Sequence, residues 1–208
     1  MYNVARNNFY NNEKNATIYT PAGVSEFLFT ILHDKIAKTS SVLDPCVGAG
    51  SLLKPFARAG FDTIGIDIEA QGYPNTIKRN FLAVRKGSFA RPSLVIANPP
   101  FNIDIKTKEL AAKIIGARPL LPEVWLQKII QLWGKTVPIC LFAPYGLRLN
   151  QTLTSKRWVK FVDGTYPAIT TIVSLPKDIY DGVLFHSEVL IFNIDGLAGH
   201  YFYNDKIK

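Results

Sequence analysis

The sequence contains little cysteine, no long apolar run and no cluster of like charges. Its two cysteines, Cys46 and Cys140, form no CxxC or CxxxC pair and cannot build a disulfide framework. We therefore expect a reducing, cytoplasmic compartment and no metal site. No stretch approaches the ~20 apolar residues that span a bilayer, and residues 1–16 are polar, so we expect neither a membrane helix nor a signal peptide.

The composition indicates one folded, basic domain. Apolar residues make up 48% and charged residues 19% of the 208 positions, which excludes a disordered chain and allows one well-buried core. The net charge is +8, and the positive residues are scattered along the chain. An excess of positive charge favours a polyanionic partner, usually nucleic acid, although many small proteins are mildly basic.

Helix and strand patterns alternate along most of the chain. Alternation predicts parallel strands joined by right-handed crossovers in a three-layer sandwich, and the last two adjacent strands predict an antiparallel hairpin. We expect an irregular arm over 1–16 and a single α/β domain over 17–208. The expected helices are 21–37, 50–59, 122–133 and 154–162, and the expected strands are 41–44, 62–69, 76–84, 93–97, 136–144, 168–176 and 187–194.

A glycine-containing turn follows the first expected strand. It reads Asp44-Pro-Cys-Val-Gly48-Ala-Gly50 and leads into a helix. Glycines there allow a ligand to approach the backbone, and the helix N-terminus offers free N–H groups to an anion. The spacing is not G-x-G-x-x-G, so a plain turn between strand and helix is the alternative.

An acidic residue ends the second expected strand. Asp67 lies 23 residues after Asp44, close to the position at which a carboxylate binds a nucleoside ribose at its two hydroxyls. Asp67 is the better candidate, although Glu69 is close enough to be confused with it. Without the glycine turn, either acid would be interpreted as an ordinary solvated turn residue.

Asn98-Pro99-Pro100-Phe101 directly follows a strongly apolar strand. The prolines remove two N–H donors, so nearby carbonyls can point outward, and the Asn98 side chain adds another acceptor. Together they can hold an –NH2 group, while Phe101 offers a flat surface to a planar aminated ring such as adenine. The alternative is a proline-rich turn with Phe101 in the core.

In this order, the motifs resemble those of the N6-adenine DNA methyltransferases. The arrangement is similar to the gamma group and to modification subunits of type I systems, and the segment 175–193 resembles that family's final hairpin. The likeness extends over residues 17–195. The motifs that carry it are Tyr19-Thr20-Pro21, Asp44-Pro45 with Gly48 and Gly50, Gly65-Ile66-Asp67, Asn80-Phe81-Leu82 and Asn98-Pro99-Pro100-Phe101.

The resemblance implies a Rossmann-like methyltransferase fold with a mostly parallel seven-stranded sheet, and S-adenosylmethionine as cofactor. It implies that Asn98, Pro99, Pro100 and Phe101 act on an adenine flipped out of DNA. Asn80 departs from the family, which often has an acid there, and this weakens one expected contact. The residues that the resemblance assigns to the cofactor are Tyr19, Thr20, Pro21, Asp44, Cys46, Gly48, Gly50, Asp67, Ile68, Asn80 and Phe81.

The sequence leaves no room for the separate target-recognition domain that this family usually carries. We expect either a partner protein that supplies specificity or DNA contacts from two basic segments, 102–121 and 145–167. Trp158 and Phe161 in the second segment are expected to form the buried face of a helix. The candidate phosphate contacts are Lys106, Lys108, Lys113, Arg118, Arg148, Lys156, Arg157 and Lys160.

Other functions remain open at this point. The same chemistry on guanine N2 in RNA or on glutamine in protein uses a similar motif, although the helical N-terminal domains of the glutamine enzymes are absent. A catalytically silent module that binds cofactor or DNA, such as an anti-restriction decoy or a partner-dependent subunit, is a further alternative. The intact Asn98–Phe101 motif argues against a decoy.

Overall fold

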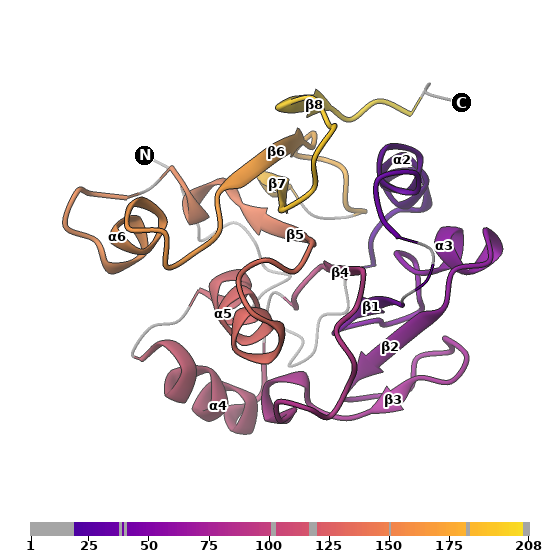
Figure 1. The fold of residues 1–208 in the computed structure, drawn as a ribbon, viewed down its shortest axis with the longest axis horizontal. Coiled ribbons are helices and arrows are strands. Elements are labelled where there is room, and N and C mark those ends of the chain that lie inside the picture. Colours follow the sequence, from indigo (N-terminus) through magenta and orange to yellow (C-terminus); the bar gives the residue numbers. More distant parts are fainter. Residues whose placement is uncertain are drawn as a thin grey trace.

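The computed structural model describes residues 19–37, 39, 41–100, 103–116, 120–149, 151–181 and 184–205. Within these residues the strands form an eight-stranded sheet in the order β3-β2-β1-β4-β5-β7-β6-β8. Helices cover both faces of this sheet (Figure 1). The expected irregular arm over 1–16 lies outside the described residues.

The elements have the following bounds. The strands are β1 (Val42–Asp44), β2 (Thr63–Asp67), β3 (Ile77–Lys78), β4 (Leu94–Ala97), β5 (Ile139–Pro144), β6 (Ile169–Ser174), β7 (Ser187–Phe192) and β8 (His200–Phe202). The helices are α2 (Ala22–Leu32), α3 (Lys54–Arg58), α4 (Ile105–Ile115), α5 (Leu121–Trp133) and α6 (Lys156–Val162), with short 3-10 turns η2 (Phe81–Ala83) and η3 (Tyr145–Leu147).

The sheet topology confirms the expected parallel half and antiparallel end. β1 pairs in parallel with both β2 and β4, and β4 pairs in parallel with β5. β7 runs antiparallel between β5 and β6. The expectation of seven strands is wrong, because β8 adds an eighth by pairing in parallel with β6. This strand has three residues and none of them is buried, so it lacks an apolar pattern.

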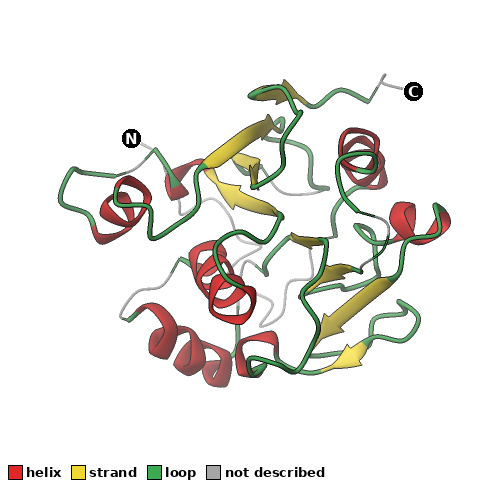
Figure 2. Ribbon diagram, viewed as in Figure 1, coloured by secondary structure: helices red, strands yellow, loops and turns green. Residues whose placement is uncertain are grey.

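Side chains on the two faces of the sheet pack into two cores. On one face, Val42 and Ile96 join a cluster with Leu28 of α2 and Phe56 of α3. On the other face, β-strand residues pack against α4 and α5 in a second cluster that includes Val124 and Leu126. Figure 2 shows the helices on either side of the strands. The expected three-layer sandwich is therefore confirmed.

Several helices differ from the expected bounds. α2 ends five residues before the expected limit, and α3 begins only at Lys54 because turns occupy 51–53. α4 was not expected. It begins where the Asp104 side chain accepts a hydrogen bond from the Thr107 N–H at 2.7 Å, and its buried residues are only Thr107 and Ala111. Among the described residues, no helix is long and apolar enough to cross a membrane.

α6 forms as expected, but its aromatic residues are placed differently. Trp158 is 37% exposed, and Phe161 is half-buried against the Tyr166 ring at a centroid distance of 5.2 Å. No residue of this helix is fully buried. The expected buried face of Trp158 and Phe161 is therefore wrong. α6 lies at the surface because Tyr166, just beyond it, fills the core position.

Candidate active site

A cleft opens at the carboxyl edge of the parallel strands and encloses about 1100 Å³, counting its open mouth. This edge is where open α/β sheets bind ligands. Pro21 and Gly50 do not line the cleft, and Phe101 lies outside the described residues. The other candidate site residues line it together: Tyr19, Thr20, Asp44, Cys46, Gly48, Asp67, Ile68, Asn80, Phe81, Asn98, Pro99 and Pro100.

The two glycines of the turn after β1 have different structural roles. Gly48 has φ +49° and faces the cleft, where an added Cβ would stand 3.4 Å from Cε1 of Tyr19. Gly50 has φ +81° and faces inward, where an added Cβ would stand 2.0 Å from Cδ2 of Tyr73. Gly48 therefore keeps backbone open to a ligand, whereas Gly50 makes room for a tyrosine that supports the turn.

Asp67 connects the turn after β1 to the end of β2. Its Oδ2 accepts a hydrogen bond from the Gly48 N–H at 2.8 Å, and its Oδ1 accepts one from the Glu69 N–H at 3.1 Å. Each carboxylate oxygen can accept a further bond, because an ionised carboxylate has about four acceptor positions. Asp67 is nearly buried, whereas Glu69 is exposed at the cleft.

Asp44 is a buried acid beneath the same turn. Its Oδ1 accepts a hydrogen bond from the Cys46 N–H at 3.0 Å, and only 1% of the residue is exposed. Burial raises the pKa of Asp44 to about 7, and the charge of Asp67 adds to this shift. Because two carboxylates stand close together at the cleft, they favour a ligand that carries positive charge.

Cys46 links the turn to the segment after β4. Its thiol donates to the Asn98 carbonyl oxygen, with Sγ 3.3 Å from that atom. Burial raises the pKa of this thiol well above its ordinary value, and the charge of Asp44 raises it further. Cys46 therefore stays protonated at neutral pH and acts as a donor that holds Asn98 beside the glycine turn.

Asn98 stands at the cleft immediately after β4. Its Nδ2 donates to Oγ1 of Thr20 at 3.1 Å, which directs the amide nitrogen toward the segment before α2. The Oδ1 atom is then the part of the amide that can accept from a ligand amine. Pro99 is buried and Pro100 is half-buried, and both line the cleft.

Asn80 and Phe81 form the far end of the cleft. The Asn80 Oδ1 accepts from the Leu82 N–H at 3.0 Å, and its Nδ2 donates to Oγ1 of Thr107 at 2.8 Å. An amide can make both bonds at once, because its oxygen accepts and its nitrogen donates. The asparagine therefore joins η2 to α4.

Sequence reasoning missed several cleft residues. Ser51 and Leu52 follow the glycine turn directly and could have been included from their position alone. Asp104 and Thr107 belong to α4, which was not expected. Trp125 reaches the cleft from α5, and the centroid of its ring lies 6.4 Å from that of Phe81. Trp125 does not belong to any of the sequence motifs. Its buried indole N–H has no hydrogen-bond partner among the described residues.

Residues 1–71 match the family N-6 DNA Methylase. No curated protein sequence matches the chain. A protein described as a modification subunit of a type I restriction enzyme from Vibrio vulnificus has a similar structure, with a TM-score of 0.65, 17% identity, and coverage of 91% of this chain and 46% of that one.

Two further solved structures share the fold. One is described as a class I S-adenosylmethionine-dependent methyltransferase from Listeria monocytogenes, with a TM-score of 0.64, 14% identity, and coverage of 88% and 64% of the two chains. The other is described as an RNA methyltransferase from Pyrococcus horikoshii, with a TM-score of 0.53, 14% identity, and coverage of 86% and 87%. This chain spans less than two thirds of the Listeria and Vibrio proteins.

The likeness to N6-adenine methyltransferases and the expected fold class are thereby confirmed, apart from the number of strands. At identities this low, structural similarity establishes the fold alone. It does not establish the substrate or the partners. The chain has the α/β fold of S-adenosylmethionine-dependent methyltransferases, residues 1–71 match the N-6 DNA methylases, and S-adenosylmethionine is the expected cofactor.

Proposed function

We propose that this protein transfers a methyl group from S-adenosylmethionine to N6 of adenine in DNA. The observation that carries the proposal is the position of Asn98 and Pro99 in the same cleft as Gly48 and Asp67. An amine-binding motif and a nucleoside-binding motif therefore face one space. The basic charge of the chain and the N-6 DNA methylase match over residues 1–71 support DNA as the substrate.

The residues of the cleft fit S-adenosylmethionine. The cofactor carries a sulfonium and an ammonium, and the neighbouring carboxylates Asp44 and Asp67 favour such positive charge. Asp67 keeps acceptor positions for the ribose hydroxyls, and Gly48 leaves the backbone open beside Tyr19. When bound, the cofactor supplies a strongly electrophilic methyl group.

The protein's own residues position the amine. The lone pair of adenine N6 is delocalised into the ring, so the free amine is a weak nucleophile. The Asn98 Oδ1 and the Pro99 carbonyl accept its two hydrogens, which favours a more tetrahedral nitrogen whose lone pair can react. Holding that nitrogen in line with the methyl group supplies most of the rate, and no strong general base is needed.

The target adenine must leave the duplex to reach this cleft, and Phe101 would then stack on it. The type I similarity supports a specificity subunit as partner, because the Vibrio protein is described as a modification subunit. A cytoplasmic location suits both DNA as substrate and the two free cysteines.

The second candidate is methylation of RNA. It is favoured by the Pyrococcus horikoshii protein, which is described as an RNA methyltransferase and matches this chain over most of both lengths. Guanine N2 in RNA is an exocyclic amine, so the same acceptors could hold it.

Transfer of tritium from labelled S-adenosylmethionine to DNA, RNA and protein, offered separately, tests the proposal. We expect label in DNA of mixed sequence, and labelling slower by ~10²-fold or more with the Asn98→Ala variant. Label in RNA or protein alone would contradict the DNA assignment. A Cys140→Ala variant serves as a matched control, because Cys140 is buried in β5 and does not line the cleft.

A further inference from the structure

The segment between β5 and β6, residues 145–167, is fastened to the core by two buried carboxylates; we call it the β5–β6 arm. Glu188 is fully buried and accepts hydrogen bonds from Nε and Nη2 of Arg148, both at 2.8 Å. Glu123 is 4% exposed and accepts a bond from Nε of Arg157 at 2.6 Å. Among the described residues these are the only buried glutamates, and both hold arginines of the same arm.

Stability alone does not explain these pairs. Glu188 lies in β7, whose six residues are all buried, and it shares a face with Leu190 and Phe192. Removing a carboxylate from water is costly, and apolar residues of similar size often stabilise such a position equally well or better. What the contacts show is that each carboxylate fixes the direction of one guanidinium group.

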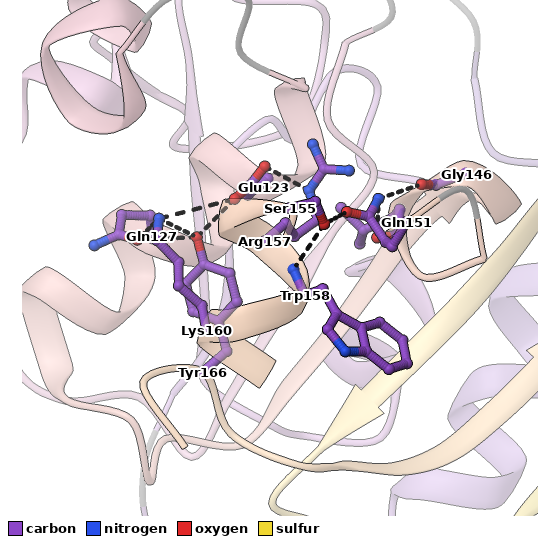
Figure 3. Close-up of polar contacts among 10 residues, drawn as sticks. Glu123, Gln127, Gly146, Gln151, Ser155, Arg157, Trp158, Lys160 and Tyr166 are labelled. Atoms are coloured by element: carbon purple, nitrogen blue, oxygen red, sulfur yellow. Dashed lines mark hydrogen bonds and ion pairs between the residues drawn. The ribbon is translucent and has the colours of Figure 1, made fainter. Parts of the chain in front are cut away.

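The cations of the arm differ in what remains available to a ligand. The Lys160 Nζ contacts Gln127 Oε1 at 3.3 Å, the Tyr166 hydroxyl at 3.0 Å and Glu123 Oε1 at 3.8 Å, so three groups of the protein already surround this ammonium, although 27% of the side chain is exposed (Figure 3). An arginine has five N–H donors in a fixed plane. Two donors of Arg148 bind Glu188, and Arg157 uses its Nε, so both keep donors on the other side.

The two pairs lie on the edge of the sheet where the cleft opens. Glu188 pairs with Ala143 across β5 and β7, and Ala97 pairs with Leu141 across β4 and β5. Continuing that register by two residues places Pro99 level with Ala143, and so with Glu188. Glu123 is in the first turn of α5, and Trp125, two residues later, lines the cleft. The side chains of Arg148 and Arg157 stay 29% and 18% exposed.

We propose that Arg148 and Arg157 bind two phosphates of the DNA backbone beside the target adenine, with Glu188 and Glu123 as positioning residues. The proposal rests on the proposed function and names how this chain holds its substrate. Guanidinium groups suit this role because their planar donors match phosphate oxygens on one edge while the other edge stays on a carboxylate. Such contacts fix the orientation of the duplex and carry no sequence information.

The test uses variants that remove each pair without changing net charge: Arg148→Met with Glu188→Gln, and Arg157→Met with Glu123→Gln. The matched control is Arg58→Met with Glu26→Gln, which removes an exposed ion pair between α3 and α2. DNA binding is measured by fluorescence anisotropy of a labelled duplex at several salt concentrations, with S-adenosylhomocysteine present and no turnover. Thermal unfolding and S-adenosylhomocysteine binding are recorded for every variant.

Each arm variant is expected to weaken DNA binding roughly three- to tenfold and to lower the slope of log K against log salt by about one. The control is expected to match the unaltered protein. Equal slopes in all proteins would overturn the proposal, and so would an equal loss in the control. If a double variant does not fold, Arg148→Lys and Arg157→Lys decide: unchanged affinity contradicts the proposal, and a loss of threefold or more supports it.

This readout is separate from methyl transfer. An unaltered protein that binds DNA but does not methylate it contradicts the proposed function, while the slopes still decide the role of the two arginines. An unaltered protein that binds RNA and not DNA overturns the inference.

Discussion

Asp67 and Asn98 line the same cleft but form hydrogen bonds with different residues. Substituting Asp67 should therefore affect cofactor binding, and substituting Asn98 should affect the rate of methyl transfer. Asp67→Ala removes a charged acceptor, and such hydrogen bonds contribute ~1.5–3 kcal/mol. We expect S-adenosylmethionine binding, measured by calorimetry, to weaken roughly ten- to hundredfold. Asn98→Ala should leave that affinity within about threefold and lower the rate of methyl transfer by ~10²-fold or more.

Glu69→Ala is the control for Asp67, because Glu69 is the exposed acid two residues away. It should change cofactor affinity little. Loss of cofactor binding in Asn98→Ala, with Asp67→Ala unaffected, would show that the two roles are reversed.

Asp44 makes cofactor affinity depend on pH. Its pKa of about 7 means that most molecules carry a protonated Asp44 at pH 6. A cationic ligand stabilises the ionised carboxylate, so binding below pH 7 must release a proton. We expect S-adenosylmethionine affinity to fall about tenfold per pH unit below 7 and to level off above it. Calorimetry between pH 5.5 and 8 measures this, and Asp44→Asn should remove the dependence. A flat profile in the unaltered protein would contradict the assignment.

Sequence alone located the residues that stand in short motifs at strand ends. Asp44, Asp67 and Asn98 could be placed together because parallel strands end at one edge. Trp125 and Thr107 could not, because long-range packing of α5 and α4 brings them to the cleft. The different roles of Gly48 and Gly50 could not be predicted from the sequence either, because they depend on where Tyr73 packs.

Replacing Gly50 should destabilise the protein more than replacing a glycine in an ordinary exposed turn. Gly50→Ala would place a Cβ 2.0 Å from the Tyr73 ring, at φ +81°. We expect the free energy of unfolding to fall by about 3 kcal/mol or more, from overpacking added to backbone strain. Gly60→Ala is the matched control, with φ +81° and nothing within 4 Å of the added Cβ, and should cost about 1 kcal/mol. Urea unfolding measures both. Equal losses would mean that backbone strain alone is responsible.

At the scale of elements, strongly periodic segments were predictable and short or polar ones were not. α5 agrees with its expected bounds to within one residue because its apolar residues repeat at helical spacing. α4 buries only Thr107 and Ala111, so its pattern is weak. β8 forms by pairing with β6, and the local sequence pattern does not predict this pairing.

At the scale of the whole molecule, the order of the motifs carried more information than any one of them. The parallel half of the sheet and the antiparallel β7 could be derived from alternation and from the missing helix between the last two expected strands. The exposed position of Trp158 could not, because Glu123 contacts Arg157 and Tyr166 contacts Lys160, and these polar contacts hold α6 at the surface (Figure 3). This chain covers 46% of the Vibrio protein, so the part of that protein that has no counterpart here could not be considered in predicting the substrate.

Mass spectrometry of nucleosides from DNA methylated by the purified protein tests the central claim most directly. DNA lacking prior methylation is incubated with S-adenosylmethionine and the protein, with any specificity partner that copurifies, and is then digested to nucleosides. We expect N6-methyldeoxyadenosine in the reaction with the unaltered protein, and an amount lower by ~10²-fold or more after the same time with Asn98→Ala. Methylated cytosine, or no methylated nucleoside in DNA while RNA from a parallel reaction gains methylguanosine, would contradict it.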